Sequence, residues 1–237
     1  MNEEVYLRHA KSFKNHWWFK SRVLIFDTLL KNLNLKKNIQ ILDYGSGVGS
    51  NLSLLKRLGN VHALEPHTPA AIILKKKFKV KVIYKIKEKY DLIFLTDVIE
   101  HVKNDKKKIN ELISCLKKNG YLVLTAPAFQ FLFSKKDETL HHYRRYNANN
   151  LVKLFSKKKI EITKLTYFNF ILFFPIVISI LFFKLFKINF INSVEKTPFS
   201  LINYYMFKIF SFERYILKYF NLNFGLSLLL IVKKVNK

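Results

Sequence analysis

The sequence predicts an α/β fold with a doubly wound, mostly parallel seven-stranded sheet. Two observations support this prediction. Short apolar runs alternate with helical stretches from residue 39 to about residue 154, which is typical of parallel strands connected by helices on both faces of a sheet. A glycine-rich turn at residues 45–49 follows the first apolar run and precedes a helical stretch. Turns of this kind let the backbone approach a nucleotide at the edge of such a sheet.

The core strands and their connecting helices follow from the apolar pattern. Five apolar runs predict strands at 39–44, 61–64, 80–84, 92–96 and 121–125. Three stretches between them predict helices at 51–58, 68–77 and 105–118. The Asn119-Gly120 pair follows Lys117 and Lys118, which indicates a helix stop before the fifth strand.

Both ends of the chain differ from this core. An aromatic and aliphatic pattern predicts an N-terminal helical region, and further strands are predicted at 160–168 and 226–232. A hydrophobic helical insertion precedes the last strand. The chain therefore divides into a helical cap at 1–35, a core at 36–168, the insertion at 169–222 and a closing strand of the core sheet at 223–237.

The charge of the chain predicts anionic partners such as phosphates or acidic lipids. Lys and Arg total 42 against 16 Asp and Glu, which gives a formal charge of +26. The excess is mostly Lys, whereas nucleic-acid recognition usually relies on Arg as well. The single Cys115 excludes a disulfide framework and a cysteine-only metal site. No apolar run of signal-peptide length opens the sequence, so we expect a cytoplasmic protein.

The segment from Asp43 to Glu65 predicts a nucleotide site. An apolar strand leads into Gly45, Gly47 and Gly49, and a helix follows. The N-terminus of a helix presents free N–H groups. Glu65 ends the second strand, 22 residues after Asp43, where a carboxylate can accept both ribose hydroxyls. The alternative is an ordinary tight turn beside a surface Glu.

With these residues in place, the sequence resembles the class I S-adenosylmethionine-dependent methyltransferases, which have a Rossmann-like fold. It resembles in particular a bacterial subgroup with an aromatic N-terminal helix and a C-terminal hydrophobic helical insertion. The matching residues are His16-Trp17-Trp18-Phe19 with Arg22, the segments 42–49, 90–93, 97–102 and 116–122, Glu65, Ala126-Pro127, and the acidic, His and Arg residues of 137–146.

The resemblance implies a cofactor, S-adenosyl-L-methionine, and roles for the matching residues. Gly45, Gly47 and Gly49 would lie against its methionine moiety. Asp43 would meet its amino group or orient the turn, and Glu65 would hold the ribose. Asp97 would also face the cofactor, and Arg22 would reach its carboxylate or else pair with Glu3 or Glu4 at the surface. The family often has an acidic residue for adenine after the third strand, and residues 80–87 provide none there.

The predicted acceptor side lies after the fifth strand. His141, His142 and Arg144 are candidate catalytic residues, because a His can serve as a base and Arg can bind an anionic acceptor. Asp137 or Glu138 could orient a His. The alternative is a structural lid in which Arg144 or Arg145 pairs with these carboxylates. His101 is expected to pack or to act indirectly. No metal site is expected, because adjacent His residues lack a further ligand cluster.

The predicted function is methyl transfer to a small or lipid-linked acceptor. Two alternatives remain. The charge of +26 is compatible with an RNA methyltransferase, and the apolar insertion is compatible with a non-catalytic, membrane-bound scaffold that keeps the fold. Residues 170–183 would form a helix of about 21 Å, which is short of the roughly 30 Å hydrocarbon core. We therefore expect 170–183 and the amphipathic 199–220 either to lie on an anionic membrane surface or to cap the fold.

Overall fold

The central element is a seven-stranded sheet with the order β3-β2-β1-β4-β5-β7-β6. A computed structural model describes residue 10 and residues 12–155, 159–186 and 198–235 of the chain. The strands are β1 (Ile39–Tyr44), β2 (Gly59–Leu64), β3 (Lys81–Ile83), β4 (Tyr90–Thr96), β5 (Leu116–Pro127), β6 (Ile160–Phe168) and β7 (Ser227–Lys234).

The sheet is mostly parallel, as predicted. Strands β1 to β5 pair in parallel. Strand β7 is antiparallel to both of its neighbours, β5 and β6. Because β6 therefore points the same way as β5, the carboxyl ends of β1, β2, β4, β5 and β6 meet at one edge of the sheet. Parallel sheets bind their ligands at this edge.

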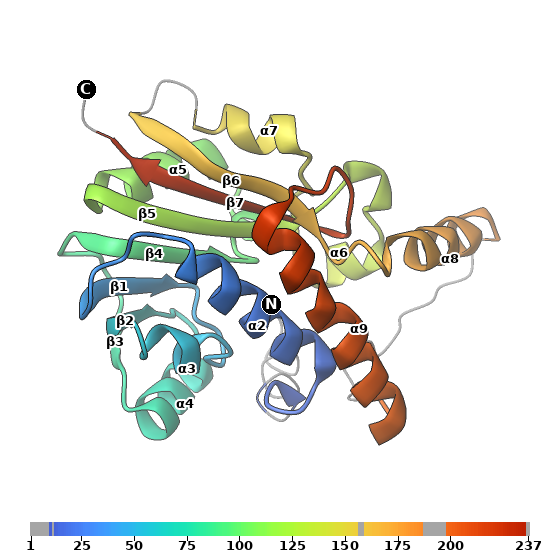
Figure 1. The fold of residues 1–237 in the computed structure, drawn as a ribbon, viewed down its shortest axis with the longest axis horizontal. Helices are drawn as coiled ribbons and strands as arrows, with labels where there is room; N and C mark the ends of the chain where they lie inside the picture. Colours follow the sequence, from blue (N-terminus) through green and yellow to red (C-terminus); the bar gives the residue numbers. More distant parts are fainter. Residues whose placement is uncertain (1–9, 11, 156–158, 187–197, 236–237) are drawn as a thin grey trace.

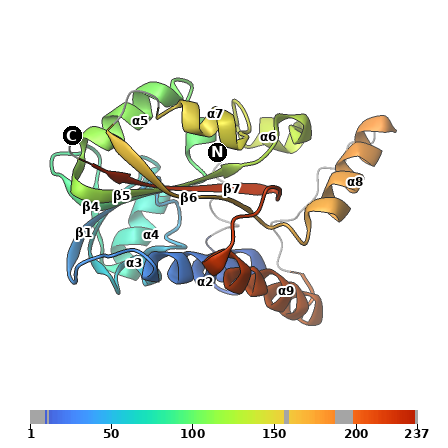
Figure 2. The same ribbon diagram turned by 45° about the horizontal axis from the view of Figure 1, so that its top comes forward.

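Helices cover both faces of the sheet (Figures 1 and 2). One face carries α2 (Trp17–Lys31), α3 (Leu52–Leu55), α4 (Thr68–Phe78) and α9 (Ser200–Tyr219). The other face carries α5 (Asp105–Ser114) and α7 (Ala148–Lys153). Helix α6 (Lys135–Thr139) follows β5, and α8 (Phe173–Leu185) projects from the body. The fold is the Rossmann-like arrangement that the sequence predicts.

Helix α2 is the main element in the described part of the predicted N-terminal cap, of which residues 1–9 and 11 lie outside the described residues. His16 begins it, since its side chain accepts a hydrogen bond from the Trp18 N–H. Trp17 and Trp18 both contact the ring of Phe210 on α9, at centroid distances of 5.6 and 5.2 Å. This aromatic contact fastens α9 to α2. Within the described residues, the predicted helical region is confirmed over Trp17–Lys31, and the helix ends at Lys31 rather than at residue 35.

The predicted helix 105–118 is wrong at its C-terminal end. Helix α5 ends at Ser114, and β5 begins at Leu116. Leu116 is fully buried and pairs with Tyr90 of β4, and Lys117 forms an ion pair with Asp91 at 2.8 Å. These contacts draw the chain out of the helix early, so that the Asn119-Gly120 pair lies inside β5 and not at a helix stop. Helix α3 is also shorter than the predicted 51–58.

The insertion contains the two predicted helices, α8 and α9. Glu213 of α9 is fully buried, and its carboxylate accepts hydrogen bonds from the N–H groups of Asn169 at 2.5 Å and Ile171 at 3.3 Å. These bonds fix the start of the α8 segment to α9. Within the described ranges, no helix has both the length and the apolar composition needed to cross a bilayer.

Candidate functional site

The glycine-rich turn after β1 lies at the carboxyl edge of the sheet. Gly45, Gly47 and Gly49 all have positive φ angles, of 72°, 52° and 84°. A Cβ atom at Gly45 would lie 2.5 Å from Val98, so a larger residue does not fit there. Apart from Gly47 itself and its two chain neighbours, no atom of the described residues lies within 4 Å of the place where Gly47 would carry a Cβ. The backbone at Gly47 is therefore open to a ligand, as the predicted cofactor site requires.

Glu65 lies beside this turn, at the end of β2. One carboxylate oxygen accepts a hydrogen bond from the Gly47 N–H at 2.7 Å, and the other accepts one from the His67 N–H at 2.9 Å. The side chain is buried. These bonds hold the carboxylate against the glycine turn. The predicted ribose ligand and the predicted methionine-binding turn thus form one unit.

Asp43 contributes a buried carboxyl group at the end of β1. Burial raises the pKa of this carboxyl to about 7. Its Oδ2 atom has no hydrogen-bond partner among the described residues. A buried carboxylate with an unpaired oxygen is unfavourable in the free protein. A cationic group would restore the missing interaction, and this is the chemistry of the cofactor's amino group.

Arg22 pairs with Asp97, which follows β4. A second guanidinium nitrogen donates to the Thr125 hydroxyl at 3.1 Å, and this hydroxyl donates to Asp97 at 2.9 Å. The guanidinium also lies over the rings of Trp18 and Phe26, at 5.4 and 5.3 Å from their centroids. The Arg22 side chain is thus held at the sheet edge by Asp97.

The alternative partners of Arg22 at the surface, Glu3 and Glu4, lie outside the described residues. The Nε atom of Arg22 is buried and has no partner within the described part of the chain. The sheet edge thus offers one unpaired cationic N–H from Arg22, one unpaired carboxyl oxygen from Asp43 and the open backbone at Gly47. These residues fit S-adenosylmethionine, which carries a carboxylate and an amino group at one end.

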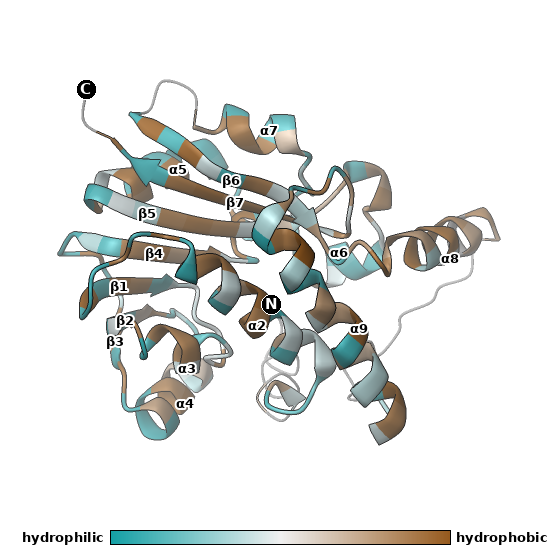
Figure 3. Ribbon diagram, viewed as in Figure 1, coloured by the Kyte–Doolittle hydropathy of each residue, from teal (hydrophilic) through white to brown (hydrophobic). Residues whose placement is uncertain are grey.

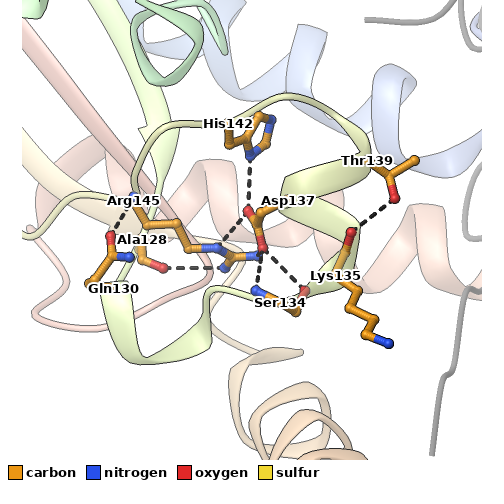
Figure 4. A network of polar contacts seen from close by, with 8 residues as sticks. All are labelled: Ala128, Gln130, Ser134, Lys135, Asp137, Thr139, His142 and Arg145. Atoms are coloured by element: carbon orange, nitrogen blue, oxygen red, sulfur yellow. Dashed lines mark hydrogen bonds and ion pairs between the residues drawn. The ribbon is translucent and has the colours of Figure 1, made fainter. Parts of the chain in front are cut away.

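Asp137 is the centre of the polar network on the acceptor side (Figure 4). Its buried carboxylate accepts two hydrogen bonds from Arg145, both at 2.9 Å, and contacts Nδ1 of His142 at 2.9 Å. Ser134 caps α6 by donating to the same carboxylate. Although burial raises the pKa of Asp137, the bonds from His142 and Arg145 hold it well below its usual range. Asp137 is therefore ionised at neutral pH.

A cluster of proton-binding groups lies between Asp137 and Asp97. One carboxylate oxygen of Glu100 and one ring nitrogen from each of His101 and His142 lie within 4.8 Å of one another. Burial, together with the charge of Asp97, raises the pKa of Glu100 well above its ordinary value. Burial and the nearby His142 lower the pKa of His101 to about 4. His101 is therefore uncharged at neutral pH, and Glu100 holds a proton more tightly than an ordinary Glu.

The structure separates the three predicted catalytic residues. His142 is held by Asp137, as predicted for one of the His residues. His141 has a positive φ of 59° and an exposed side chain. Arg144 instead pairs with Asp105 at 2.8 Å and donates to the Lys103 carbonyl. Since Arg145 is bound to Asp137, both Arg residues have protein partners, and the expected pair of free cations for an anionic acceptor is not what the structure shows.

Glu100 was not among the predicted site residues, and the pairing of Arg145 with Asp137, which the structure shows at 2.9 Å, was predicted only as the alternative of a structural lid. Glu100 lies 42 residues before His142 in the chain, and the single-turn 3-10 helix Ile99–His101 brings it to the cluster. One signal was available: Ser134 and Asp137 have the spacing of a capping box. That spacing predicts that Asp137 lies in the first turn of a helix, with its carboxylate turned back towards Ser134.

Sequence comparison gives one family and one characterised relative. The family described as a methyltransferase domain matches residues 17–162. The ubiquinone biosynthesis O-methyltransferase of Pelagibacter ubique is 27% identical over 159 residues. This match covers 56% of the present chain and 66% of that enzyme, which is slightly less than two thirds of its length.

Two solved structures have the same fold. Coclaurine N-methyltransferase, bound to N-methylheliamine and SAH, aligns with a TM-score of 0.58 and 16% identity over 89% of this chain and 72% of its own. The [4+2]-cyclase SpnF aligns with a TM-score of 0.57 and 13% identity over 92% of this chain and 81% of its own. A methyltransferase and a cyclase share the fold, so the fold alone does not define the reaction.

Proposed function

We propose an acceptor for this chain from the premise that it belongs to the methyltransferase-domain family and is an S-adenosylmethionine-dependent methyltransferase. The acceptor is a hydroxyl group on an uncharged, hydrophobic molecule, including one with a lipid tail. The observation that carries this proposal is the contact between Asp137 and His142 at 2.9 Å. The O-methyltransferase activity named for the Pelagibacter relative supports a hydroxyl acceptor.

His142 is suited to remove a proton from a hydroxyl group. In its neutral form, it donates from Nδ1 to the ionised Asp137, which leaves Nε2 free to accept a proton. The charge of Asp137 also stabilises the imidazolium that results. A correctly placed base of this kind accelerates a reaction by roughly 10²- to 10⁴-fold.

Methyl transfer needs alignment as well as a base. The cofactor supplies an electrophilic methyl group on a good leaving group. The chain must hold the acceptor oxygen in line with that methyl group, and such alignment supplies much of the acceleration. His142 Nε2 would take the hydroxyl proton as the oxygen attacks. The buried Glu100 and the half-buried His101 lie beside His142.

The surroundings favour an uncharged acceptor. Arg144 and Arg145 are both engaged in ion pairs, at 2.8 and 2.9 Å, so an acceptor phosphate would compete with Asp105 and Asp137. The segment after β5 is aromatic instead. Phe129 stacks on Tyr167 at 5.0 Å, and the side chain of Phe131 is 54% exposed. These rings suit an apolar or aromatic acceptor.

The test uses S-adenosylmethionine with a ¹³C-labelled methyl group and a lipid extract as the source of acceptor. The NMR chemical shift of the labelled methyl group distinguishes oxygen, nitrogen and carbon acceptors. We expect an O-methyl product in the lipid fraction. Transfer to nitrogen, to carbon or to RNA would overturn the proposal.

The role of His142 is tested with a matched pair of variants. His142→Ala should lower turnover by roughly 10²- to 10⁴-fold and leave the affinity for S-adenosylmethionine unchanged. His141→Ala, one residue away and exposed, should retain turnover. If both variants lose turnover equally, or if cofactor affinity falls with His142→Ala, His142 supports the structure and is not the base.

A further inference from the structure

Helices α8 and α9 carry a large exposed apolar surface, which we call the α8–α9 surface. Its side chains are 41% to 77% exposed. They are Phe174, Ile178, Leu181, Phe182 and Leu185 of α8, and Leu201, Tyr204, Tyr205, Ile209, Phe212, Tyr215 and Tyr219 of α9. Large exposed apolar surfaces are rare on soluble monomers unless they bind something.

Helix α8 contributes most to the apolar character of this surface. Its residues are hydrophobic almost throughout, and the helix projects away from the sheet (Figures 1, 2 and 3). Its contacts with the body are at its start, where Phe173 lies 5.6 Å from the ring of Phe129 and 5.5 Å from that of Phe224. A helix that is hydrophobic on all sides normally lies in a protein core or in lipid. Here the body leaves most of it uncovered.

Helix α9 adds a pattern of basic and aromatic residues. Three cations lie over Tyr rings: Lys208 over Tyr204 at 5.4 Å, Arg214 over Tyr215 at 4.6 Å and Lys218 over Tyr219 at 5.0 Å. The only acidic residue in the described parts of 173–224 is Glu213, which is fully buried. Tyr, Lys and Arg are the residues that favour the boundary between lipid tails and headgroups.

The α8–α9 surface lies next to the acceptor side of the site. Strand β6 ends at Phe168, at the same sheet edge as β5, and α8 begins at Phe173. Phe129, in the segment after β5, contacts both Tyr167 of β6 and Phe173 of α8. If α8 lies on an external surface, an acceptor that leaves this external surface would therefore reach the segment between β5 and His142 without crossing the protein.

We propose that the α8–α9 surface docks the enzyme on an anionic phospholipid bilayer. Helix α8 has 13 residues, which as a helix reach about 20 Å, so it lies in the interface and does not cross the roughly 30 Å core. The Lys and Arg residues of α9 contact lipid phosphates. The further step, that the hydrophobic acceptor comes from this bilayer, rests on the proposed function. Docking itself does not.

The test is flotation of the full chain with vesicles of phosphatidylcholine and phosphatidylglycerol, compared with phosphatidylcholine alone. We expect binding to the anionic vesicles at low salt and weaker binding to the neutral ones. Phe182→Ser combined with Leu185→Ser should lower the partition coefficient by about tenfold or more. Lys208→Glu combined with Lys218→Glu should lower it by about thirtyfold or more.

Matched controls separate a local effect from a general one. Ile72→Ser with Tyr84→Ser removes exposed apolar groups elsewhere, and Lys106→Glu with Lys107→Glu changes the same charge on α5. Both controls should bind vesicles as the unchanged protein does. Equal losses in a variant and its control would overturn the proposal, because the effect would then not depend on the α8–α9 surface.

Two further outcomes would also overturn it. One is an intact protein that stays unbound at low salt. The other is a dimer of the unchanged protein, detected by light scattering, in a sample that does not bind vesicles. If Phe182→Ser with Leu185→Ser dissociates this dimer, the α8–α9 surface binds a second copy of the chain. Calorimetric titration with S-adenosylmethionine is run on the same samples. Retained cofactor binding and turnover without vesicle binding would refute docking alone and leave the methyltransferase assignment intact.

Discussion

Arg22 on helix α2 forms an ion pair with Asp97 at the end of β4, across 75 residues of sequence. The side chain of Arg22 is 8% exposed, whereas that of Asp97 is 38% exposed. Asp97 also has a positive φ of 54°, so the pair holds a residue in an uncommon backbone conformation. The N-terminal helix therefore supplies part of the cofactor edge of the sheet.

We predict that Arg22→Ala lowers the free energy of unfolding by about 2–3 kcal/mol, because it leaves the Asp97 carboxylate without its partner. Urea unfolding measures this change. The control is Arg57→Ala, which breaks an ion pair between Arg57 and Asp27 whose Arg side chain is 61% exposed. That variant should lose less than about 1 kcal/mol. Similar losses would mean that Arg22 contributes no more than a surface charge.

Replacing Glu65 should weaken cofactor binding. A hydrogen bond to a charged group contributes roughly 1.5–3 kcal/mol, so Glu65→Ala should raise the dissociation constant for S-adenosylmethionine by about ten- to a hundredfold. Isothermal titration calorimetry measures this constant. Glu161→Ala, at an exposed position on β6, serves as the control and should bind normally. An unchanged affinity of Glu65→Ala would remove Glu65 from the site.

The raised pKa of Asp43 predicts that cofactor binding depends on pH. Its pKa in the free protein is raised to about 7, and the ionised form is the one that attracts an amino group. Affinity for S-adenosylmethionine should therefore rise between pH 5 and about pH 7, and Asp43→Asn should abolish this rise. Calorimetry at several pH values checks both statements. A pH-independent affinity in the unchanged protein would contradict the proposed contact.

The same raised pKa predicts the stability of the free protein. A buried carboxyl with a raised pKa binds a proton more tightly when folded than when unfolded. Stability consequently falls as the pH rises from about 4 towards 7. Asp43→Asn should remove this loss and make the cofactor-free protein more stable above pH 7, by about 2–4 kcal/mol. Thermal unfolding at pH 5 and pH 8 measures the difference.

The two neighbouring Arg residues should differ in their effect on stability. Arg145→Ala leaves the buried Asp137 without its bidentate partner and should cost about 3 kcal/mol. Arg144→Ala removes a pair whose Arg side chain is 33% exposed and should cost about 1 kcal/mol. Since the pKa of Asp137 is lowered on folding, its contribution is present above about pH 4 and is lost as the pH falls. Equal costs in urea unfolding would contradict this account.

Local sequence patterns predicted the elements that local forces define. The alternation of apolar residues set the bounds of β1 and β6, and both match the predicted 39–44 and 160–168. The glycine spacing predicted the turn beside Glu65. The start of β5 was missed because it depends on Leu116 pairing with Tyr90 of another strand. Local propensity carries no information on such a contact.

The acceptor side could be predicted only in part, for the same reason. The His and Arg residues of 141–145 and their candidate partner Asp137 are visible in the sequence, but the pairing of Arg144 with Asp105 is not. Asp105 and Asp137 are both acidic residues near helix N-termini. Only the folded chain decides that Arg144 binds the first and Arg145 the second. The cluster of Glu100 with His142 likewise depends on the approach of two separate segments.

The place of β7 in the sheet has a consequence for protein synthesis. β7 lies between β5 and β6 and pairs with both of them, yet the ribosome makes it after either neighbour. β6 has no other strand partner in the described sheet. A nascent chain that has released β6, α8 and α9 therefore still exposes the edge of β5 and the unpaired strand β6, and unpaired edges of this kind are templates for aggregation. Chaperone protection is needed most at this stage, and a nonsense codon just before Ser227 would release β6 from the sheet as well as removing β7.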